Sequence, residues 1–419
     1  MARRAKERSE PVENKQASSA SKPTDRLQAL MEVFRISTIL GLTSFGGPIA
    51  HLGYFHDEYI RRRKWMDEKS YADLVALCQT LPGPASSQVG IGIGIIRAGL
   101  LGGIVAWAGF TLPSVVALVL FAYFLQGFEM MDAGWIHGLK IVAVAIVAQA
   151  ILGMGQKLTP DKNRVTIAII AATGTLLWQT AFSQVSIIIA AGIIGILMYQ
   201  KEVIPESPPL SVPVSRRVAV VSLVLFAGLL IILPLLRQFT TLGLGWLPLF
   251  DSLYRAGSLV FGGGHVLLPM LEREVVPMGW ISREDFLAGY GAAQAVPGPL
   301  FTFAAYLGAM TNGVLGSLIA TVAIFLPAFL LIIGALPFWN QLRKSKRLQG
   351  ALMGINAAVV GILLAAWYNP LWTTAILSPA DFALASILFS MLVFWKLPPW
   401  VVVIFGAAGG VMISLFGAV

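Results

Sequence analysis

The feature that most constrains this chain is a helix-breaking phrase that occurs twice inside long apolar segments. Phe45-Gly-Gly-Pro48 interrupts one segment, and Phe261-Gly-Gly-Gly264 interrupts another at an offset of 216 residues. Proline lacks an amide donor, and glycine adopts backbone angles that other residues avoid. In hydrocarbon, backbone groups left unpaired by such breaks are tolerated only where protein or a water-filled cavity surrounds them. The two breaks therefore predict two related polar regions inside a membrane protein.

The apolar segments themselves define the fold class. Of the 419 residues, 57% are hydrophobic and 12% are charged, whereas a soluble domain is roughly 25% charged. Several segments have the roughly 20 apolar residues that a helix needs to cross a bilayer, and they lack the alternation of an outer-membrane barrel. We therefore expect an all-α polytopic membrane protein. The expected segments are 28–56, 70–97, 101–126, 136–156, 163–179, 183–199, 216–236, 247–271, 285–310, 313–338, 348–368, 380–396 and 399–418.

Further matches at nearly the same offset indicate two homologous halves. Glu58 matches Glu274, and after one deletion Pro82-Gly-Pro84 falls on Pro297-Gly-Pro299. After a second deletion, Pro113 falls on Pro327. We expect four parts: a disordered basic cytoplasmic tail (1–27), an N-terminal transporter repeat (28–200), a linker with one extra transmembrane helix (201–240) and a C-terminal repeat (241–419).

The loop charges predict that the two halves have opposite orientations. Basic residues mark cytoplasmic loops, and Arg61 to Lys64 follow the first break, whereas Glu272, Arg273 and Glu274 follow the second. The next matching loops reverse this pattern, with Glu129 and Asp132 in the first half and Arg343 to Arg347 in the second. The basic residues before and after segments 28–56 and 70–97 can all be cytoplasmic only if each of these segments enters and leaves the membrane on the same side. Both segments are therefore expected to be re-entrant hairpins. The N-terminus is then cytoplasmic and the C-terminus outside.

Inverted repeats with broken helices are the architecture of many secondary transporters. A break creates a helix N-terminus, whose unpaired amides and partial positive charge suit an anion. The alternative is that these glycines and prolines only allow close helix packing or kinks. The candidate substrate-binding residues are Gly46, Gly47, Pro48, Gln79, Gly83, Ser86 and Ser87, with Arg255, Gly262, Gly263, His265, Gln294, Gly298 and Thr302 in the second half.

Ionisable residues within membrane segments are functional candidates. Glu58, Glu274 and His51 are the candidates for proton coupling, with surface carboxylates and a helix-end histidine as the plainer alternatives. Arg35 lies near the basic tail, where snorkelling to the interface is the alternative. Cys78 is the only cysteine, so we expect a core thiol. No HExxH motif, EF-hand loop or Cys/His cluster occurs, so we expect neither a metal site nor a cofactor.

The net charge of +9 arises largely in the tail and loops. Such basic tails indicate orientation or attraction to lipid headgroups, not nucleic-acid binding.

At these motifs the sequence resembles the chromate ion transporter family in its long, two-domain form. The resemblance is densest from Phe45 to Pro84 and from Phe261 to Pro299. It implies a multi-pass protein of the bacterial inner membrane, not an enzyme, that exports chromate and confers resistance, driven by protons or the membrane potential. Sulfate is the implied competing oxyanion. An uncoupled anion channel and a membrane scaffold are the alternatives, and both a monomer and a homodimer stay open.

Overall fold

The computed structural model describes residues 23–127, 134–178, 183–199, 213–239, 246–261, 263–342 and 344–416. Within these ranges the regular structure is helical, with no strand, so the all-α class is confirmed. Residues 1–22 of the predicted tail lie outside the described residues, and the first helix begins at Pro23, inside the predicted tail.

The first half and the connecting helix contain α1 (Pro23–Thr43), α2 (Gly47–Phe55), a π-helix (His56–Arg62), α3 (Glu68–Thr80), α4 (Ala85–Gly127), α5 (Gly134–Leu158), α6 (Lys162–Leu177), α7 (Ser183–Met198) and α8 (Arg216–Phe239). The second half contains α9 (Leu247–Leu259), α10 (Leu267–Val275), α11 (Arg283–Ala293), α12 (Phe303–Ala335), α13 (Trp339–Leu342), α14 (Lys346–Ala366), α15 (Thr373–Ala375), α16 (Pro379–Val393) and α17 (Pro399–Leu415). Short 3-10 turns precede α10, α12 and α13, and a second π-helix (Trp367–Trp372) follows α14.

Helix α4 consists of two antiparallel arms. Ala98 and Gly99 leave helical geometry, with Gly99 at a φ of +74°, and the chain reverses there. The arms then touch so closely that a Cβ on Gly94 would overlap the Gly102 carbonyl. Helix α12 reverses in the same way at Asn312 and Gly313. These turns confirm the predicted ends of segments 70–97 and 285–310.

A second antiparallel pair precedes each of these turns. Helix α3 folds back on the first arm of α4, where a Cβ on Gly92 would lie 2.9 Å from the Leu74 side chain. Helix α11 packs in the same way on the start of α12, with the Phe286 and Phe303 rings 5.1 Å apart. Helix α3 has 13 residues, which gives it a length of about 20 Å, whereas the bilayer core is about 30 Å thick. Both segments are therefore short hairpins, and their entry and exit on one membrane side stays a prediction.

Equivalent residues start the two hairpins. The Asp67 carboxylate accepts bonds from the Lys69 and Ser70 amides at the start of α3. The Ser70 hydroxyl and amide hold the pKa of Asp67 below its usual range. At the start of α11, the Ser282 hydroxyl accepts from the Asp285 amide. Side-chain caps of this kind satisfy amides that have no partner within the helix.

The first break differs in one respect from the prediction. The chain does break between α1 and α2, with Gly46 at a φ of +97°, but the following helix does not end at residue 56. It continues as the π-helix, so Glu58 lies on a helix rather than at the start of a loop. Ion pairs from Asp57 to Arg61 and from Glu58 to Arg62 stabilise this extra turn.

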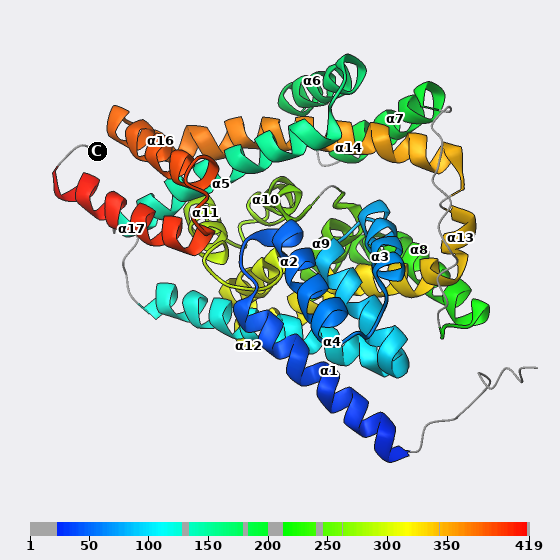
Figure 1. Ribbon diagram of the computed structural model, residues 1–419. Helices are drawn as coiled ribbons and strands as arrows, with labels where there is room; N and C mark the ends of the chain where they lie inside the picture. Colours follow the sequence, from blue (N-terminus) through cyan, green and yellow to red (C-terminus); the bar gives the residue numbers. More distant parts are fainter. Residues whose placement is uncertain are drawn as a thin grey trace, which may run out of the picture.

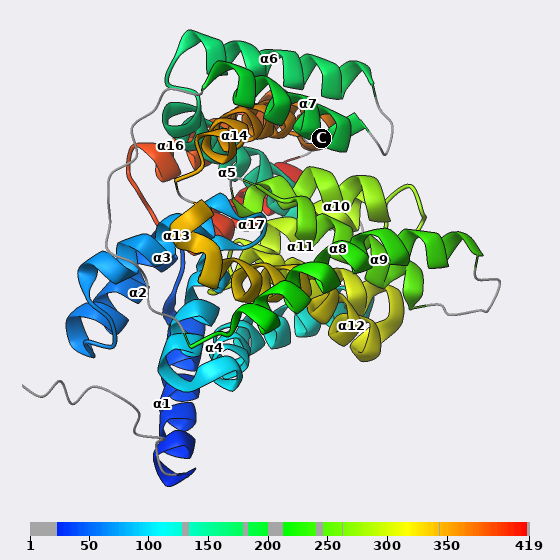
Figure 2. The ribbon, with the colours of Figure 1, turned by 90° about the vertical axis from the view of Figure 1, so that its right-hand side faces the viewer.

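The two halves exchange helices. Helix α5 of the first half packs on α16 and α17 of the second, and α14 of the second half packs on α6 and α7 of the first. The two contacts are equivalent in the two halves. Gly138 of α5 contacts Gly406 of α17, and Gly354 of α14 contacts Ala191 of α7. Small residues allow this close approach of backbones. Figures 1 and 2 show α6, α7 and α14 gathered on one side of the molecule, with α1 and α4 on the other.

The outer surface is apolar, as a bilayer requires. Among the described residues, five helices are long and apolar enough to span a membrane. In α8, only 17% of the most apolar window is buried in the protein, so most of that helix lies on the apolar surface. Helices α6, α7, α16 and α17 have 15 to 17 residues, about 25 Å at most. Full crossing by each of these four stays a prediction.

Candidate functional site

Two reciprocal hydrogen bonds join the four breaks across the two halves. The Gly83 amide donates to the Val260 carbonyl at 2.7 Å, and the Gly298 amide donates to the Ser44 carbonyl at 2.8 Å. Gly83 and Gly298 are the central residues of the two Pro-Gly-Pro loops, and Ser44 and Val260 immediately precede the two Phe-Gly-Gly runs. Each Pro-Gly-Pro loop therefore lies against the helix break of the other half.

Both loop glycines are required by this geometry. Gly83 has a φ of +112° and Gly298 a φ of +99°, angles that cost other residues about 1–2 kcal/mol. A Cβ on Gly298 would also overlap the hydroxyl of Ser114, which donates to the Pro297 carbonyl. A Cβ on Gly83 would approach Ala328, the counterpart of Ser114, at 3.6 Å.

Buried polar side chains lie beside the first break. His51 on α2 is 1% exposed, and its Nδ1 lies 3.3 Å from the Oγ of Ser86 in the first turn of α4. The imidazole packs edge-on against Phe110 and lies beside the backbone of Ser44. Ser87, the next residue of the same turn, is also buried. The structure thus brings three predicted residues, His51, Ser86 and Gly298, to one place, although they come from different segments.

At the second break, the predicted side chains have internal partners. The His265 Nδ1 lies 3.0 Å from the Tyr290 hydroxyl. The Thr302 hydroxyl donates to the Pro299 carbonyl at 2.7 Å. Gly263 has a φ of +133°, and Gly262 lies outside the described residues.

Five other predicted residues are more accessible. Gly46 and Gln79 are exposed, and Gly47 and Pro48 are half-buried. Gln294 is half-buried, with an enclosed side-chain nitrogen that lacks a partner among the described residues.

The ionisable candidates form ion pairs with one another. Arg255 donates twice to Glu274 at 2.8 Å and also to Asp251, which is 1% exposed. Asp251 accepts in addition from Arg237 at 3.3 Å. Arg255 and Glu274, predicted for substrate binding and for proton coupling, are therefore partners in one network.

Glu58 lies in a similar network in the first half. Its carboxylate accepts from Arg62 at 3.2 Å and from Arg63 at 2.8 Å. Cys78 is fully buried, as expected of a core thiol. Among the described residues, no group of three His, Cys, Asp or Glu side chains could hold a metal ion.

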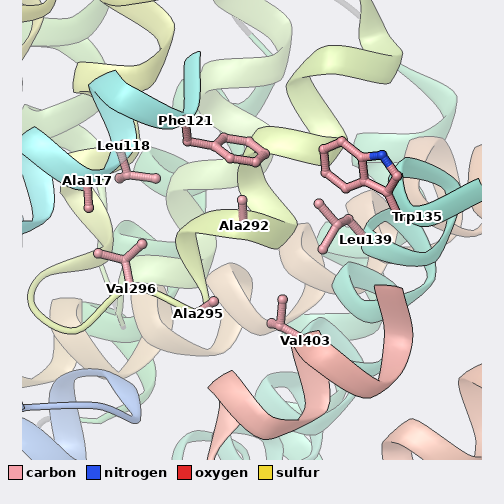
Figure 3. Close-up of a pocket in the computed structure, with 9 residues that line it drawn as sticks. All are labelled: Ala117, Leu118, Phe121, Trp135, Leu139, Ala292, Ala295, Val296 and Val403. Atoms are coloured by element: carbon pink, nitrogen blue, oxygen red, sulfur yellow. The ribbon is translucent and has the colours of Figure 1, made fainter. Parts of the chain in front are cut away.

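A cavity of about 300 Å³ lies next to the second Pro-Gly-Pro loop (Figure 3). Its lining is apolar, and the rings of Phe121 and Trp135 lie together at one end. Such a lining offers almost no donors to an anion, so the cavity is not the candidate anion site. The lining residues are Ala117, Leu118, Phe121, Trp135, Leu139, Ala292, Ala295, Val296 and Val403.

Sequence reasoning missed Ser44, Val260 and Ser114. Ser44 and Val260 contribute backbone carbonyls, which no side-chain pattern reveals. Ser114 bonds to a residue 183 positions away. The only available signal was position, since Ser44 and Val260 stand at equivalent places one residue before the two breaks.

The family model described as "Chromate transporter" matches residues 31–196 and 247–411. The chain belongs to the chromate transporter family. The two matched regions fit the two halves of the fold. The chain is thus a multi-pass membrane protein of a transporter family.

The chain is similar to curated relatives over most of its length. It is 27% identical to a chromate transport protein of Pseudomonas aeruginosa, covering 95% of this chain and 97% of the relative. It is 28% identical to a probable chromate transport protein of Synechococcus elongatus, covering 78% and 81%. It is 25% identical to a chromate transport protein of Cupriavidus metallidurans, covering 82% of each. No solved structure matches the chain.

Proposed function

We propose that this protein is a secondary transporter that moves chromate, or a similar tetrahedral oxyanion, across the bacterial inner membrane. The observation that carries the proposal is the pair of reciprocal hydrogen bonds from Gly83 to Val260 and from Gly298 to Ser44. They bring all four helix breaks to the interface of the halves, which is where transporters built from inverted repeats bind substrate. Three relatives over most of the chain carry the name of chromate transport proteins.

The chemistry of the first break suits an oxyanion. A tetrahedral dianion requires several convergent donors, and helix N-termini and hydroxyls supply them. Ser86 and Ser87 lie in the first turn of α4, directly after the Pro-Gly-Pro loop. Sulfate has the same charge and shape as chromate, so we expect it to compete.

We further propose that transport is directed outward. The loop charges favour inverted halves, with Arg61 to Lys64 and the N-terminus cytoplasmic and the C-terminus periplasmic. A membrane potential that is negative inside then favours exit of a dianion by about 2.3 kcal/mol per charge for each 100 mV.

Uptake of radiolabelled chromate into inverted membrane vesicles tests this function. Energised vesicles from expressing cells should accumulate more chromate than empty-vector vesicles, and excess sulfate should reduce the uptake. Equal accumulation in both preparations would contradict the proposal. A counterflow experiment separates a carrier from an uncoupled channel, because a channel shows neither uphill accumulation nor stimulation by internal anion.

A further inference from the structure

Enclosed polar atoms without partners occur at the first break. The Ser44 Oγ, the His51 Nε2 and the Ser87 Oγ have no hydrogen-bond partner among the described residues. These residues are 0%, 1% and 2% exposed. A buried donor or acceptor without a partner costs about 1–3 kcal/mol, so most buried polar groups in native structures are paired. Ser87 lies in the first turn of α4, and His51 contacts the neighbouring Ser86 although it is far away in sequence. These three unpaired groups indicate a ligand that completes them.

The second break makes the matching backbone hydrogen bond but has different side chains. Ser44 corresponds to Val260, and His51 corresponds to Leu267, at the offset of 216. The polar turn after the first Pro-Gly-Pro loop corresponds to Leu300, Phe301 and Thr302. Of these, only Thr302 is polar, and its hydroxyl is already bonded to Pro299. Near the second break, one enclosed side-chain atom, the Gln294 Nε2, lacks a partner among the described residues, compared with three at the first break. The halves are therefore symmetric in the hydrogen bonds of the Pro-Gly-Pro loops and unequal in unpaired side-chain groups.

The unpaired groups are connected through contacts. His51 reaches Ser86 through its Nδ1, which leaves the Nε2 free for a ligand. The imidazole lies beside the Ser44 backbone, whose carbonyl accepts the Gly298 amide. The first arm of α4, which runs from Ala85 to the turn at Ala98, begins at this point. The residue after α1, helix α2 and the first turn of α4 thus lie together, and Ser44 joins them to the Pro-Gly-Pro loop of the other half.

We propose that the protein holds one oxyanion site, at the first break, and that the second break is a structural counterpart without a binding role. The Ser44 hydroxyl, the His51 Nε2 and the Ser87 hydroxyl donate to the anion, together with the amides at the start of α4. In this arrangement His51 carries its proton on Nε2, and its Nδ1 accepts from the Ser86 hydroxyl. These donors are neutral or carry partial charge, so they recognise oxygen acceptors in a tetrahedral arrangement rather than one particular anion. This inference rests on the proposed function and specifies where the substrate binds.

Removal of an unpaired hydroxyl gives a distinctive result. Ser44→Ala and Ser87→Ala should leave the melting temperature of the purified, ligand-free protein unchanged or raised, because a buried orphan group is lost. Chromate should stabilise the wild type against heat, since a ligand that binds the folded state shifts its stability. In each variant this chromate-dependent shift should shrink, and the KM for vesicle uptake should rise at least tenfold.

Ser258→Ala is the matched control. Ser258 is a buried serine two positions before Val260, and its hydroxyl already donates to the Tyr254 carbonyl. Removal of the Ser258 hydroxyl should lower the melting temperature. It should leave the KM and the chromate-dependent shift in melting temperature within twofold of the wild-type values. His51→Leu adds a third test, since the second break carries Leu267 at that position, and it should also raise the KM at least tenfold.

Two failures are distinguishable in this design. If the wild type shows no chromate uptake and no chromate-dependent shift, the proposed function fails. If the wild type shows both, and Ser44→Ala and Ser87→Ala retain the wild-type KM and thermal shift, the one-site inference alone is overturned. The one-site inference would also be overturned if Ser258→Ala raised the KM and reduced the chromate-dependent thermal shift as much as the first-break variants do. Sulfate run in parallel shows whether the site distinguishes anions of the same shape.

Discussion

At the residue scale, the loop glycines are the positions where the smallest change should have the largest effect. Gly298→Ala imposes a left-handed backbone on a residue with a Cβ and drives that Cβ into the Ser114 hydroxyl. We expect a loss of stability above the 1–2 kcal/mol of backbone strain alone, together with loss of chromate uptake. Thermal unfolding and vesicle uptake measure the two effects.

Gly279→Ala is the control for this substitution. Gly279 also has a positive φ, of +70°, but a Cβ there would meet nothing within 4 Å. It should show the strain alone and retain uptake. Equal destabilisation by the two variants would contradict the close contact between the halves.

The network around Arg255 makes a separate prediction. Arg255→Leu leaves Glu274 without its strongest partner, so it should destabilise the protein, whereas the double variant Arg255→Leu/Glu274→Leu should recover part of the loss. We expect a coupling of about 1–3 kcal/mol between the two positions, as for residues in one ion-pair network, measured by a double-mutant cycle of unfolding. Additive effects would contradict the network. Uptake by the double variant also tests the predicted substrate-binding role of Arg255, since that role requires uptake to be lost.

Some site residues were predictable and others were not. Gly83, Ser86 and Gly298 follow from helix-break chemistry, which is local in sequence. Ser44 and Ser114 act through contacts that join the two halves, and no local pattern encodes such contacts. The positions of Gly46, Gln79 and His265 relative to a bound anion stay predictions.

At the element scale, the antiparallel arms of α4 and α12 depend on glycines at their contact. Gly94→Leu or Gly308→Leu would force a side chain into the opposing backbone. We expect either variant to abolish the monodisperse protein peak after detergent extraction. Gly153→Leu on α5, where a Cβ would meet nothing within 4 Å, should extract like the wild type. Normal extraction of Gly94→Leu would contradict the hairpin geometry.

The predicted ends of segments 70–97 and 285–310 lie within two residues of the turns at residues 98–99 and 312–313. The π-helix at His56–Arg62 was not predicted, because a run of charged residues reads as a loop when its pairing is unknown. In the structure, those charges pair along the helix surface and so stabilise one more turn.

At the scale of the whole molecule, the repeat was readable from sequence and the helix exchange was not. The exchange pairs Gly138 with Gly406 and Gly354 with Ala191, and glycines on many membrane helices would permit other partners. Only the equivalence of the two contacts, seen in three dimensions, shows which helices of the two halves pair.

The inversion of the halves can be tested by cysteine labelling. Cys78 is the only cysteine and is buried, so Cys78→Ala provides the background. A cysteine introduced by Arg61→Cys should react with a membrane-impermeant maleimide only from the cytoplasmic side, and one introduced by Met278→Cys only from outside. Both native side chains are exposed, at nearly matching positions after the two breaks. Labelling of both from the same side would contradict the inverted topology.

The central claim is that an oxyanion crosses at the interface where the four helix breaks meet. The most direct measurement is radiolabelled chromate uptake into proteoliposomes that contain the purified protein, with wild type and Gly298→Ala compared at equal protein content. The wild type should take up chromate saturably, with stimulation by internal chromate, and Gly298→Ala should match empty liposomes. Wild-type uptake no greater than that of empty liposomes, or full uptake by Gly298→Ala, would contradict the claim.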